Sequence, residues 1–497
     1  MKPGQPNVLL VIIDQLRADA LGCMGSPCAH TPNIDRLARR GILFARHHAQ
    51  GAPCGPSRAS IATGQYLMSH RVVNNETPTA AHLKTLPWFL REAGHEPALV
   101  GYTTTLPDLR ALHPGLARPR THSIAAGWDV VRDFEGDRRH YLAWLSGQGY
   151  SVGPDYAELF RCAATADDAS RFPAAPIAAE HTDTAWCADG ALDYLRVRAG
   201  RPWFLQLGFF RPHPPFMATA PFDALIDPGR IPLPVRAASV EHEAAIHPLN
   251  RLMLETLRAG TSVTGMAGLS CEVSAEDLRR IAVAYHGLVA EVDHHLGRVL
   301  DHLDATGQSG NTLVILTADH AEQLGDHHML SKRGYYPSSY HVPCIMVDPR
   351  PEADATRGST VTAFSENVDL LPTILEWLGQ PIPEQCDGRS LLAFLRDTVP
   401  SGWRRETHWE YDFRDLAGGK APLLLGIARH QCSLAVIRDA DHAYVHFAAL
   451  PPLLFDLRRD PGWLVNRADD PGWRDVALDM ARRMLDWRLG HADRTLT

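Results

Sequence analysis

With 497 residues, 45% of them hydrophobic, the chain is long enough for a large buried core and two subdomains. Its formal net charge of −8, with acids and bases interspersed, argues against a nucleic-acid or membrane-surface partner. The apolar run 7–13 is far too short to span a membrane, and no signal peptide with a cleavage site is visible. Nine cysteines without paired spacing suit a reducing compartment, so we expect a cytoplasmic protein.

Apolar runs of strand length alternate with helical patterns over the first four hundred residues. We expect strands at 7–13, 97–101, 203–207, 312–317 and 342–347. We expect helices at 31–41, 85–93, 182–198, 278–303 and 368–378. Residues 106–180 show poor periodicity and are interpreted as an excursion over the sheet. The alternation predicts an α/β fold with a doubly wound, mostly parallel sheet.

The pattern changes near residue 405 to shorter apolar runs. They fall at 407–411, 423–427, 433–437 and 443–447, and a helical pattern follows at 476–489. This predicts a smaller C-terminal antiparallel sheet with one helix. We therefore divide the chain into a catalytic α/β domain, 1–400, and a smaller α+β subdomain, 401–497.

Polar side chains follow several of the predicted strands directly. In doubly wound sheets, ligands bind beyond the carboxyl ends of the strands, so these segments should converge at one edge. The carboxylates of Asp14 and Asp319, the amide of Gln15 and the imidazole of His320 suit one divalent cation. Ca²⁺, Mn²⁺ and Mg²⁺ all fit, and the histidine favours Mn²⁺ or another transition metal. Alternatively, each acid merely caps the helix that follows it.

The segment around Cys54 places a thiol before a proline and an arginine. Glycine and proline after Cys54 predict a turn, and Ser57 is a plausible N-cap for the helix-like run that follows. A thiol at a helix N-terminus beside Arg58 should have a lowered pKa. The alternative is an ordinary buried cysteine of the core.

The order Cys-x-Pro-x-Arg, closed by Thr63-Gly64, resembles the signature of the formylglycine-dependent sulfatases. Residues 317–327 resemble the second conserved region of the sulfatase and alkaline phosphatase superfamily, and the resemblance covers most of 7–380. Many arylsulfatases have Asp-Asp, Lys-x-His and Asp-Asn at three points of the site. Here the three are Asp-Gln, Tyr-x-Thr and Asp-His, which looks like the cytoplasmic phosphonate monoester hydrolase and arylsulfatase branch.

The resemblance implies that a formylglycine-generating enzyme oxidises Cys54 to an aldehyde, whose hydrate attacks sulfur or phosphorus. It implies one divalent metal ion, Ca²⁺ or Mn²⁺, held by Asp14, Gln15, residue 54, Asp319 and His320. It gives catalytic roles to Cys54, Arg58, His213 and Lys332, with His213 protonating the leaving group. It gives substrate contacts to Asn75 (with Asn74 nearly as good a candidate), Tyr102 and Thr104. Because Lys-x-His is missing, the base that assists the nucleophile stays open.

The expected function is a sulfatase of the arylsulfatase type, cleaving small anionic sulfate monoesters. Phosphonate monoesters and phosphodiesters are alternative or additional substrates, because all three carry one negative charge at the reacting centre. The competing class is a non-catalytic metal- or anion-binding protein in which Cys54 stays a thiol. A two-metal phosphatase would need more acid and histidine ligands than the sequence offers. The branch also implies a homo-oligomer.

Overall fold

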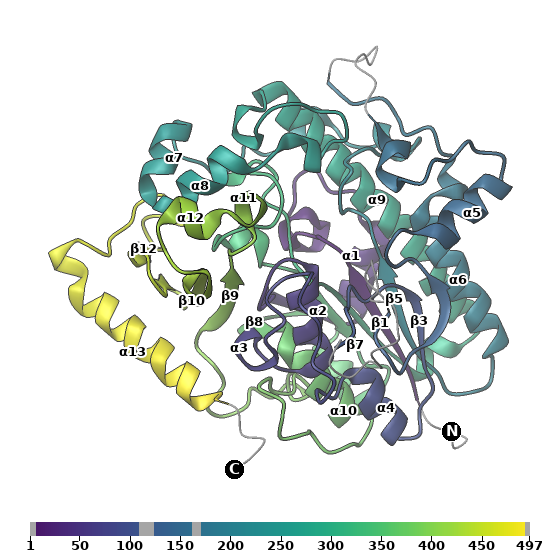
Figure 1. The fold of residues 1–497 in the computed structure, drawn as a ribbon. Coiled ribbons are helices and arrows are strands. Elements are labelled where there is room, and N and C mark those ends of the chain that lie inside the picture. The colour runs from purple at the N-terminus through teal and green to yellow at the C-terminus, as the bar shows by residue number, and fades with distance from the viewer. Residues whose placement is uncertain (1–5, 109–123, 162–169, 493–497) are drawn as a thin grey trace, which may run out of the picture.

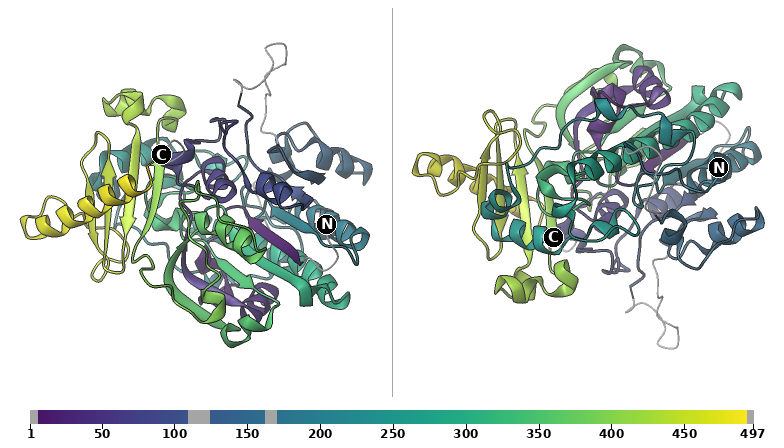
Figure 2. Two further views of the ribbon diagram at one scale, coloured as in Figure 1. Left: turned by 90° about the horizontal axis from the view of Figure 1, so that it is seen from below. Right: turned by 90° about the horizontal axis from the view of Figure 1, so that it is seen from above.

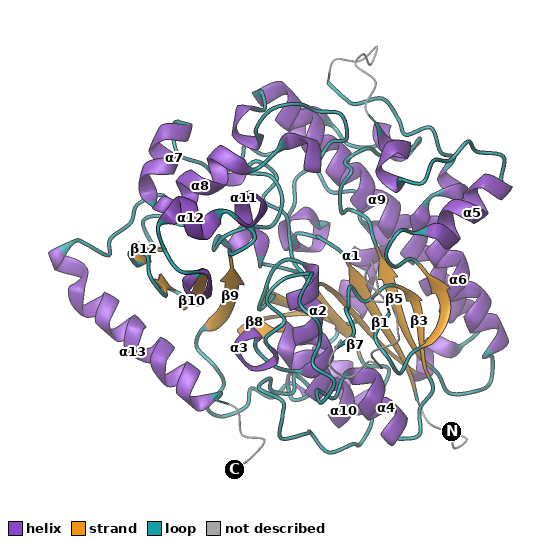
Figure 3. Ribbon diagram, in the orientation of Figure 1, coloured by secondary structure: helices purple, strands orange, loops and turns teal. Residues whose placement is uncertain are grey.

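The computed structural model describes residues 6–108, 124–161 and 170–492. It contains an eight-stranded sheet flanked by helices and a separate four-stranded sheet at the C-terminal side (Figures 1 and 3). The predicted fold, a doubly wound and mostly parallel sheet with a smaller antiparallel sheet, is confirmed. Within the described ranges, no helix combines the length and apolar character that crossing a membrane requires.

The large sheet has the strand order β4-β3-β5-β1-β6-β7-β2-β8. Only β7 runs antiparallel to its neighbours. Every residue of the central strand β1 is buried, which explains its continuous apolar sequence. The strands are β1 Asn7–Ile13, β2 Ile42–His48, β3 Pro97–Gly101, β4 Asp129–Asp133, β5 Phe204–Phe209, β6 Thr312–Ala318, β7 Cys344–Val347 and β8 Ser359–Glu366.

Helices cover both faces of this sheet. Alternate side chains of each strand point to opposite faces, and in β1 the side chains on both faces are apolar. Leu9, Val11 and Ile13 pack in the core on the side of α1 Pro32–Arg40, α6 Asp183–Val197 and α9 Ala275–Ala305. Val8, Leu10 and Ile12 pack on the side of α2 Cys54–Thr63, α4 Leu86–Glu92 and α10 Leu370–Trp377. The other helices of this part are α3 Leu67–His70, α5 Arg139–Gly147, α7 Val240–Ile246 and α8 Pro248–Thr256.

The C-terminal sheet has the order β12-β11-β10-β9, all antiparallel, and α13 packs across it at the edge of the molecule (Figure 2). Trp409 and Val436 of this sheet belong to the same core cluster as Val11 of β1, so apolar packing is continuous between the two sheets. The proposed division at residue 400 stays a prediction. The elements are β9 Thr407–Asp412, α11 Leu416–Gly419, α12 Ala421–Leu425, β10 Ser433–Arg438, β11 His442–Phe447, β12 Leu453–Asp456 and α13 Arg474–Gly490.

Outside the segment around Cys54, where Gly55 and Pro56 lie in the helix α2 and not in a turn, two sequence-based predictions of secondary structure are wrong. The apolar run 423–427 is not a strand, because Pro422 lies in the first turn of the helix α12 and Gly426 ends that helix in the left-handed conformation. The stretch 106–180 is more than an excursion. Its described residues include α5 and the edge strand β4, whose exposed side chains hide the strand pattern. The sequence also left β2, β8 and β12 unpredicted.

Candidate active site

Strand register brings the two predicted metal-binding acids together. In the parallel pair β1–β6, Ile13 lies opposite Ala318, so Asp14 and Asp319 leave the sheet at the same level. On the other side of β1, Ile13 lies opposite Phe209 of β5, which leads into the loop of His213. Residues about three hundred positions apart thus meet at one edge, as expected for the carboxyl ends of parallel strands.

Cys54 is the first residue of α2, and almost the whole helix is buried. The predicted Ser57 cap is wrong, because Pro53 occupies the N-cap position and Ser57 lies one turn inside the helix. The Ser57 hydroxyl instead donates to the main-chain carbonyl of Asp319. This bond ties the start of α2 to the end of β6 and so places residue 54 over the two acids.

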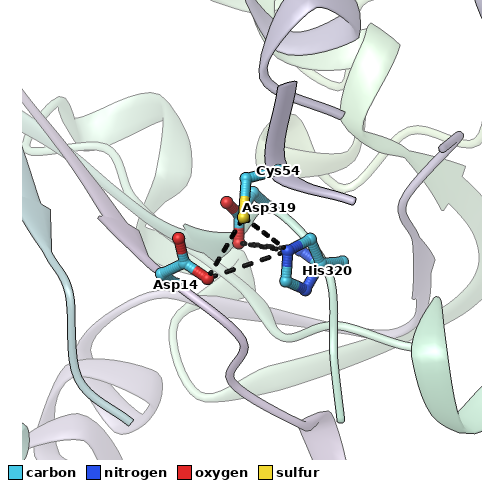
Figure 4. A group of neighbouring side chains, drawn as sticks. All are labelled: Asp14, Cys54, Asp319 and His320. Carbon is cyan, nitrogen blue, oxygen red and sulfur yellow. Dashed lines mark hydrogen bonds and ion pairs between the residues drawn. The ribbon is translucent and has the colours of Figure 1, made fainter. Parts of the chain in front are cut away.

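Four predicted metal ligands form one group in the structure. Ligand atoms of Asp14, Cys54, Asp319 and His320 all lie within 4.8 Å of one another, and all four residues are buried. Their side chains point toward a common centre (Figure 4). His320 Nε2 lies 3.1 Å from Cys54 Sγ and 3.7 Å from Asp14 Oδ1.

The chemistry of this group fits a divalent cation. His320 Nδ1 donates to the carbonyl of Ala321 at 3.2 Å, which leaves the lone pair of Nε2 directed at the group. Burial, and then Lys332, lower the pKa of His320 to about 3, so the ring is neutral near pH 7, as a ligand must be. Burial and the nearby Asp14 raise the pKa of Asp319. The raised pKa of Asp319 shows that its neighbours do not fully compensate its negative charge, and a cation would supply the missing positive charge.

Gln15, the fifth predicted ligand, adopts a left-handed backbone conformation with φ of 67°. Its main-chain N–H donates to Asp319 Oδ1 at 3.2 Å. Its side-chain amide donates to Glu322, while its side-chain oxygen accepts from Lys332. Glu322 is a site residue that the sequence analysis missed, although it lies in the quoted run 317–327. Its buried carboxylate holds Gln15 in place and also accepts from the main-chain N–H of Leu324 at 3.0 Å.

Arg58 binds both acids. Its Nε donates to Asp319 Oδ2 at 2.8 Å, and its Nη2 lies 3.4 Å from Asp14 Oδ2. The guanidinium also stacks 4.1 Å from the centre of the Tyr102 ring. The Tyr102 hydroxyl donates to Asp14 Oδ2 at 2.6 Å. Tyr102, predicted to contact substrate, thus supports a predicted metal ligand, and its contact with substrate stays a prediction.

The prediction that the thiol pKa is lowered is wrong for Cys54. Burial and then Asp14 raise that pKa well above its usual range, and these effects outweigh Lys332 and Arg58. The sequence shows the helix start and the arginine but not the buried carboxylates. An unmodified Cys54 in this setting is a thiol and a weak nucleophile near pH 7.

Three of the predicted substrate-side residues, Lys332, His213 and Asn75, lie around this centre. Lys332 is buried, with its Nζ 3.6 Å from Cys54 Sγ. His213 follows β5 and lies close enough to Lys332 and Asp14 for their charges to act on it. The Asn75 side chain accepts from the main-chain N–H of Gly55 at 2.8 Å, which favours it over Asn74 as the asparagine at the site. Thr104 has φ of 51°, and its main-chain N–H donates to Glu135 at 2.9 Å.

A family model described as Sulfatase matches residues 6–380, and a second, described as N-sulphoglucosamine sulphohydrolase, C-terminal, matches residues 325–489. The chain belongs to the sulfatase family. It is therefore a hydrolase of the alkaline phosphatase superfamily. The family implies a metal ion and a formylglycine, and the buried group around Cys54 has the donor set to hold the former.

Relatives and solved structures agree with this assignment. The chain is 42% identical to the multifunctional alkaline phosphatase superfamily protein PehA of Trinickia caryophylli, over 99% of this chain and 96% of that protein. It is 26% identical to an arylsulfatase of Clostridium perfringens, over 97% and 94% of the two chains. Its structure is similar to the phosphonate monoester hydrolase of Agrobacterium radiobacter, with a TM-score of 0.94, 38% identity and coverage of 99% and 97%. The phosphonate monoester hydrolase from Silicibacter pomeroyi gives a TM-score of 0.92, with 37% identity and the same coverage.

Proposed function

We propose that this sulfatase-family hydrolase cleaves phosphonate monoesters and related phosphodiesters. The observation that carries the proposal is its structural similarity, over nearly the whole chain, to two phosphonate monoester hydrolases. The Asp-Gln, Tyr-x-Thr and Asp-His pattern of the site supports the same branch. The order of preference is therefore the reverse of the one expected from sequence, where sulfate monoesters came first.

The divalent cation would be held by Asp14, Gln15, Asp319 and His320, together with residue 54. These oxygen and imidazole donors suit Ca²⁺ or Mn²⁺. When bound, the cation would polarise a nonbridging oxygen of the substrate and acidify the nucleophile. Formylglycine at position 54, made by a formylglycine-generating enzyme, would supply that nucleophile as a hydrated aldehyde. Arg58 lowers the pKa of both carboxylates and holds them in place through its contacts with Asp319 and Asp14.

Lys332 and His213 act on the two ends of the ester. Lys332 Nζ, next to residue 54, stabilises the charge on the nonbridging oxygens. His213 donates its Nε2 proton to the departing alcohol, because its Nδ1 is bonded to the carbonyl of Pro214 at 2.8 Å. Burial, followed by Lys332, lowers the pKa of His213 in the free protein. A bound substrate anion beside Lys332 offsets that charge and favours the imidazolium.

Sulfate monoesters are the second candidate. They carry one negative charge at the reacting centre, like phosphonate monoesters, and Lys332 is the cation of the site directed at substrate. The family model and the arylsulfatase relative support this activity. We further propose a cytoplasmic homo-oligomer. The eight described cysteines are all free thiols, which supports the reducing compartment.

The test uses 4-nitrophenyl esters with the same leaving group, so that differences in kcat/KM report the transferred group. We expect the metal-loaded protein to cleave the phenylphosphonate monoester fastest, then the phosphodiester and the sulfate. Mass spectrometry of the Cys54 peptide establishes formylglycine in the same sample, and Cys54→Ala is the inactive control. No turnover of any ester by protein with confirmed formylglycine and metal would overturn the proposal.

A further inference from the structure

One buried arginine holds the Pro-rich turn that follows β5. Arg211 is 1% exposed. Its Nη1 donates to the carbonyl oxygen of His213 at 3.2 Å and to that of Pro215 at 2.8 Å. The two carbonyls lie on either side of Pro214, so a single guanidinium fixes the backbone path of the turn.

The same guanidinium is anchored to two other elements of the fold. Its Nη2 donates to the Tyr156 hydroxyl at 2.6 Å, and its Nε donates to Oδ1 of Asp183, the first residue of α6, at 3.3 Å. The carboxylate of Glu291 on α9 also acts on its charge. A buried cation is costly unless it is paired, and here the pairing connects the turn to the helices behind the sheet.

The imidazole of His213 takes its orientation from this turn. Within the described ranges, its ring has one hydrogen bond, from Nδ1 to the Pro214 carbonyl, and packs on the Phe210 ring with centroids 4.4 Å apart. Both contacts are to residues of the turn itself. A shift of the turn backbone therefore shifts Nε2, the atom that must reach the leaving group.

We propose that Arg211 is a positioning residue for His213. By holding the carbonyls of His213 and Pro215, it places Nε2 against the leaving oxygen. The His213 imidazolium gives its Nε2 proton to that oxygen as the ester bond breaks and returns to the neutral ring that carries a proton on Nδ1. The inference rests on the proposed function, in which His213 is the leaving-group acid.

The test compares Arg211→Lys with Arg404→Lys, a matched change at a buried, ion-paired arginine that has no contact with the turn. Lysine keeps the charge but cannot reproduce the planar fork that bonds several acceptors at once. Each variant is assayed with aryl esters whose leaving phenols span a wide range of pKa. Good leaving groups need little protonation, so a misplaced acid matters most for poor ones.

For Arg211→Lys we expect kcat/KM to fall about 10²-fold with phenol as leaving group and little with 2,4-dinitrophenol, because a displacement of about 1 Å costs that much. For Arg404→Lys any loss is equal across the series. When His213 is already replaced by alanine, Arg211→Lys should cause no further loss of kcat/KM. Metal content, measured in every variant, should be unchanged.

A loss at Arg211 that is equal for all leaving groups, or that adds in full to His213→Ala, would overturn the positioning role while leaving the hydrolase activity established. No turnover by the wild type overturns the proposed function and this inference with it. If Arg211→Lys does not fold, Asp183→Ala, which removes one acceptor of the guanidinium, takes its place in the same series with the same expected dependence on the leaving group.

Discussion

Two clusters of buried charge in this protein contain the same kinds of group and differ in how their carboxylate oxygens are hydrogen-bonded. The active-site cluster consists of Asp14, Arg58, Tyr102 and Asp319. The second acid cluster consists of Tyr66, Glu366, Asp369 and Arg404. Each contains two carboxylates that share one arginine, and in each a tyrosine hydroxyl donates to a carboxylate at 2.6 Å.

The difference lies in the hydrogen bonds that the carboxylate oxygens accept. In the second acid cluster every oxygen has a close donor. Glu366 accepts from Tyr66, from Thr407 and from the main chain of His408, while Asp369 accepts from Arg404 and from two main-chain N–H groups.

In the active-site cluster one oxygen is different. Among the described residues, Asp14 Oδ1 accepts only the weak thiol hydrogen bond of Cys54, at 3.8 Å, and the unprotonated His320 Nε2 lies 3.7 Å away. A thiol is a weak donor for a buried carboxylate oxygen, and a cation would satisfy that oxygen better. Between these two clusters, the hydrogen bonds that the carboxylate oxygens accept differ more than the residue types do.

The largest effect is expected at the acids of the active-site cluster. Asp14→Ala and Asp319→Ala should each lose the metal and reduce kcat/KM by about 10³-fold or more, because the metal contributes several kcal/mol to the transition state. Metal analysis of purified protein and assays with a 4-nitrophenyl ester measure both. Full metal occupancy in the two variants would contradict the assignment of these ligands.

Arg404 of the second acid cluster should matter for stability instead. Arg404→Gln leaves two buried carboxylates without their shared cation and should lower the free energy of unfolding by about 3–5 kcal/mol. Urea unfolding measures the loss, and metal content per folded molecule serves as the control. If Arg404→Gln kept its free energy of unfolding but lost its metal, the distinction between the two clusters would be wrong.

Acid pH should destabilise the protein through buried histidines that lack charged partners. His47 bonds Ser365 and Asn367, both at 2.9 Å, and burial lowers its pKa to about 4. Since the folded pKa lies below the unfolded value, its contribution is present above about pH 6.5 and is lost as pH falls toward 4. Between pH 7 and 5 this one site accounts for about 2 kcal/mol. Urea unfolding at pH 7 and pH 5 measures how much the free energy of unfolding falls on acidification. In His47→Gln this fall should be smaller by the same amount. An unchanged fall would exclude His47 as its source.

The smallest and most direct comparison uses the two tyrosines. Tyr102→Phe should weaken metal binding about tenfold, because it removes the hydroxyl that orients Asp14. Tyr66→Phe, the matched control, removes the same 2.6 Å contact from Glu366 and should change only stability. Metal titration and thermal unfolding of both variants provide the measurements. Equal metal affinity in the two would show that Tyr102 has no influence on the site.

Much of the site could be predicted from the sequence because it lies at strand ends. The buried strands β1 and β6 are visible as apolar runs, and Asp14 and Asp319 follow them directly. The link between Gln15 and Glu322, and that between Ser57 and the Asp319 carbonyl, join segments distant in the chain and could not be predicted. The edge strand β4 was missed because most of its side chains are exposed and lack the apolar signal.

By itself, the sequence determined the central buried strands and the long helices, the Cys-x-Pro-x-Arg segment and the polar residues that follow β1 and β6. Only the tertiary structure decided that the pKa of Cys54 is raised, since burial and Asp14 act through space. It likewise decided that Asp14 Oδ1 has only a thiol as its hydrogen-bond donor among the described residues. Local sequence sets backbone conformation over a few residues, whereas charge and hydrogen bonding in a core depend on neighbours supplied by the whole fold.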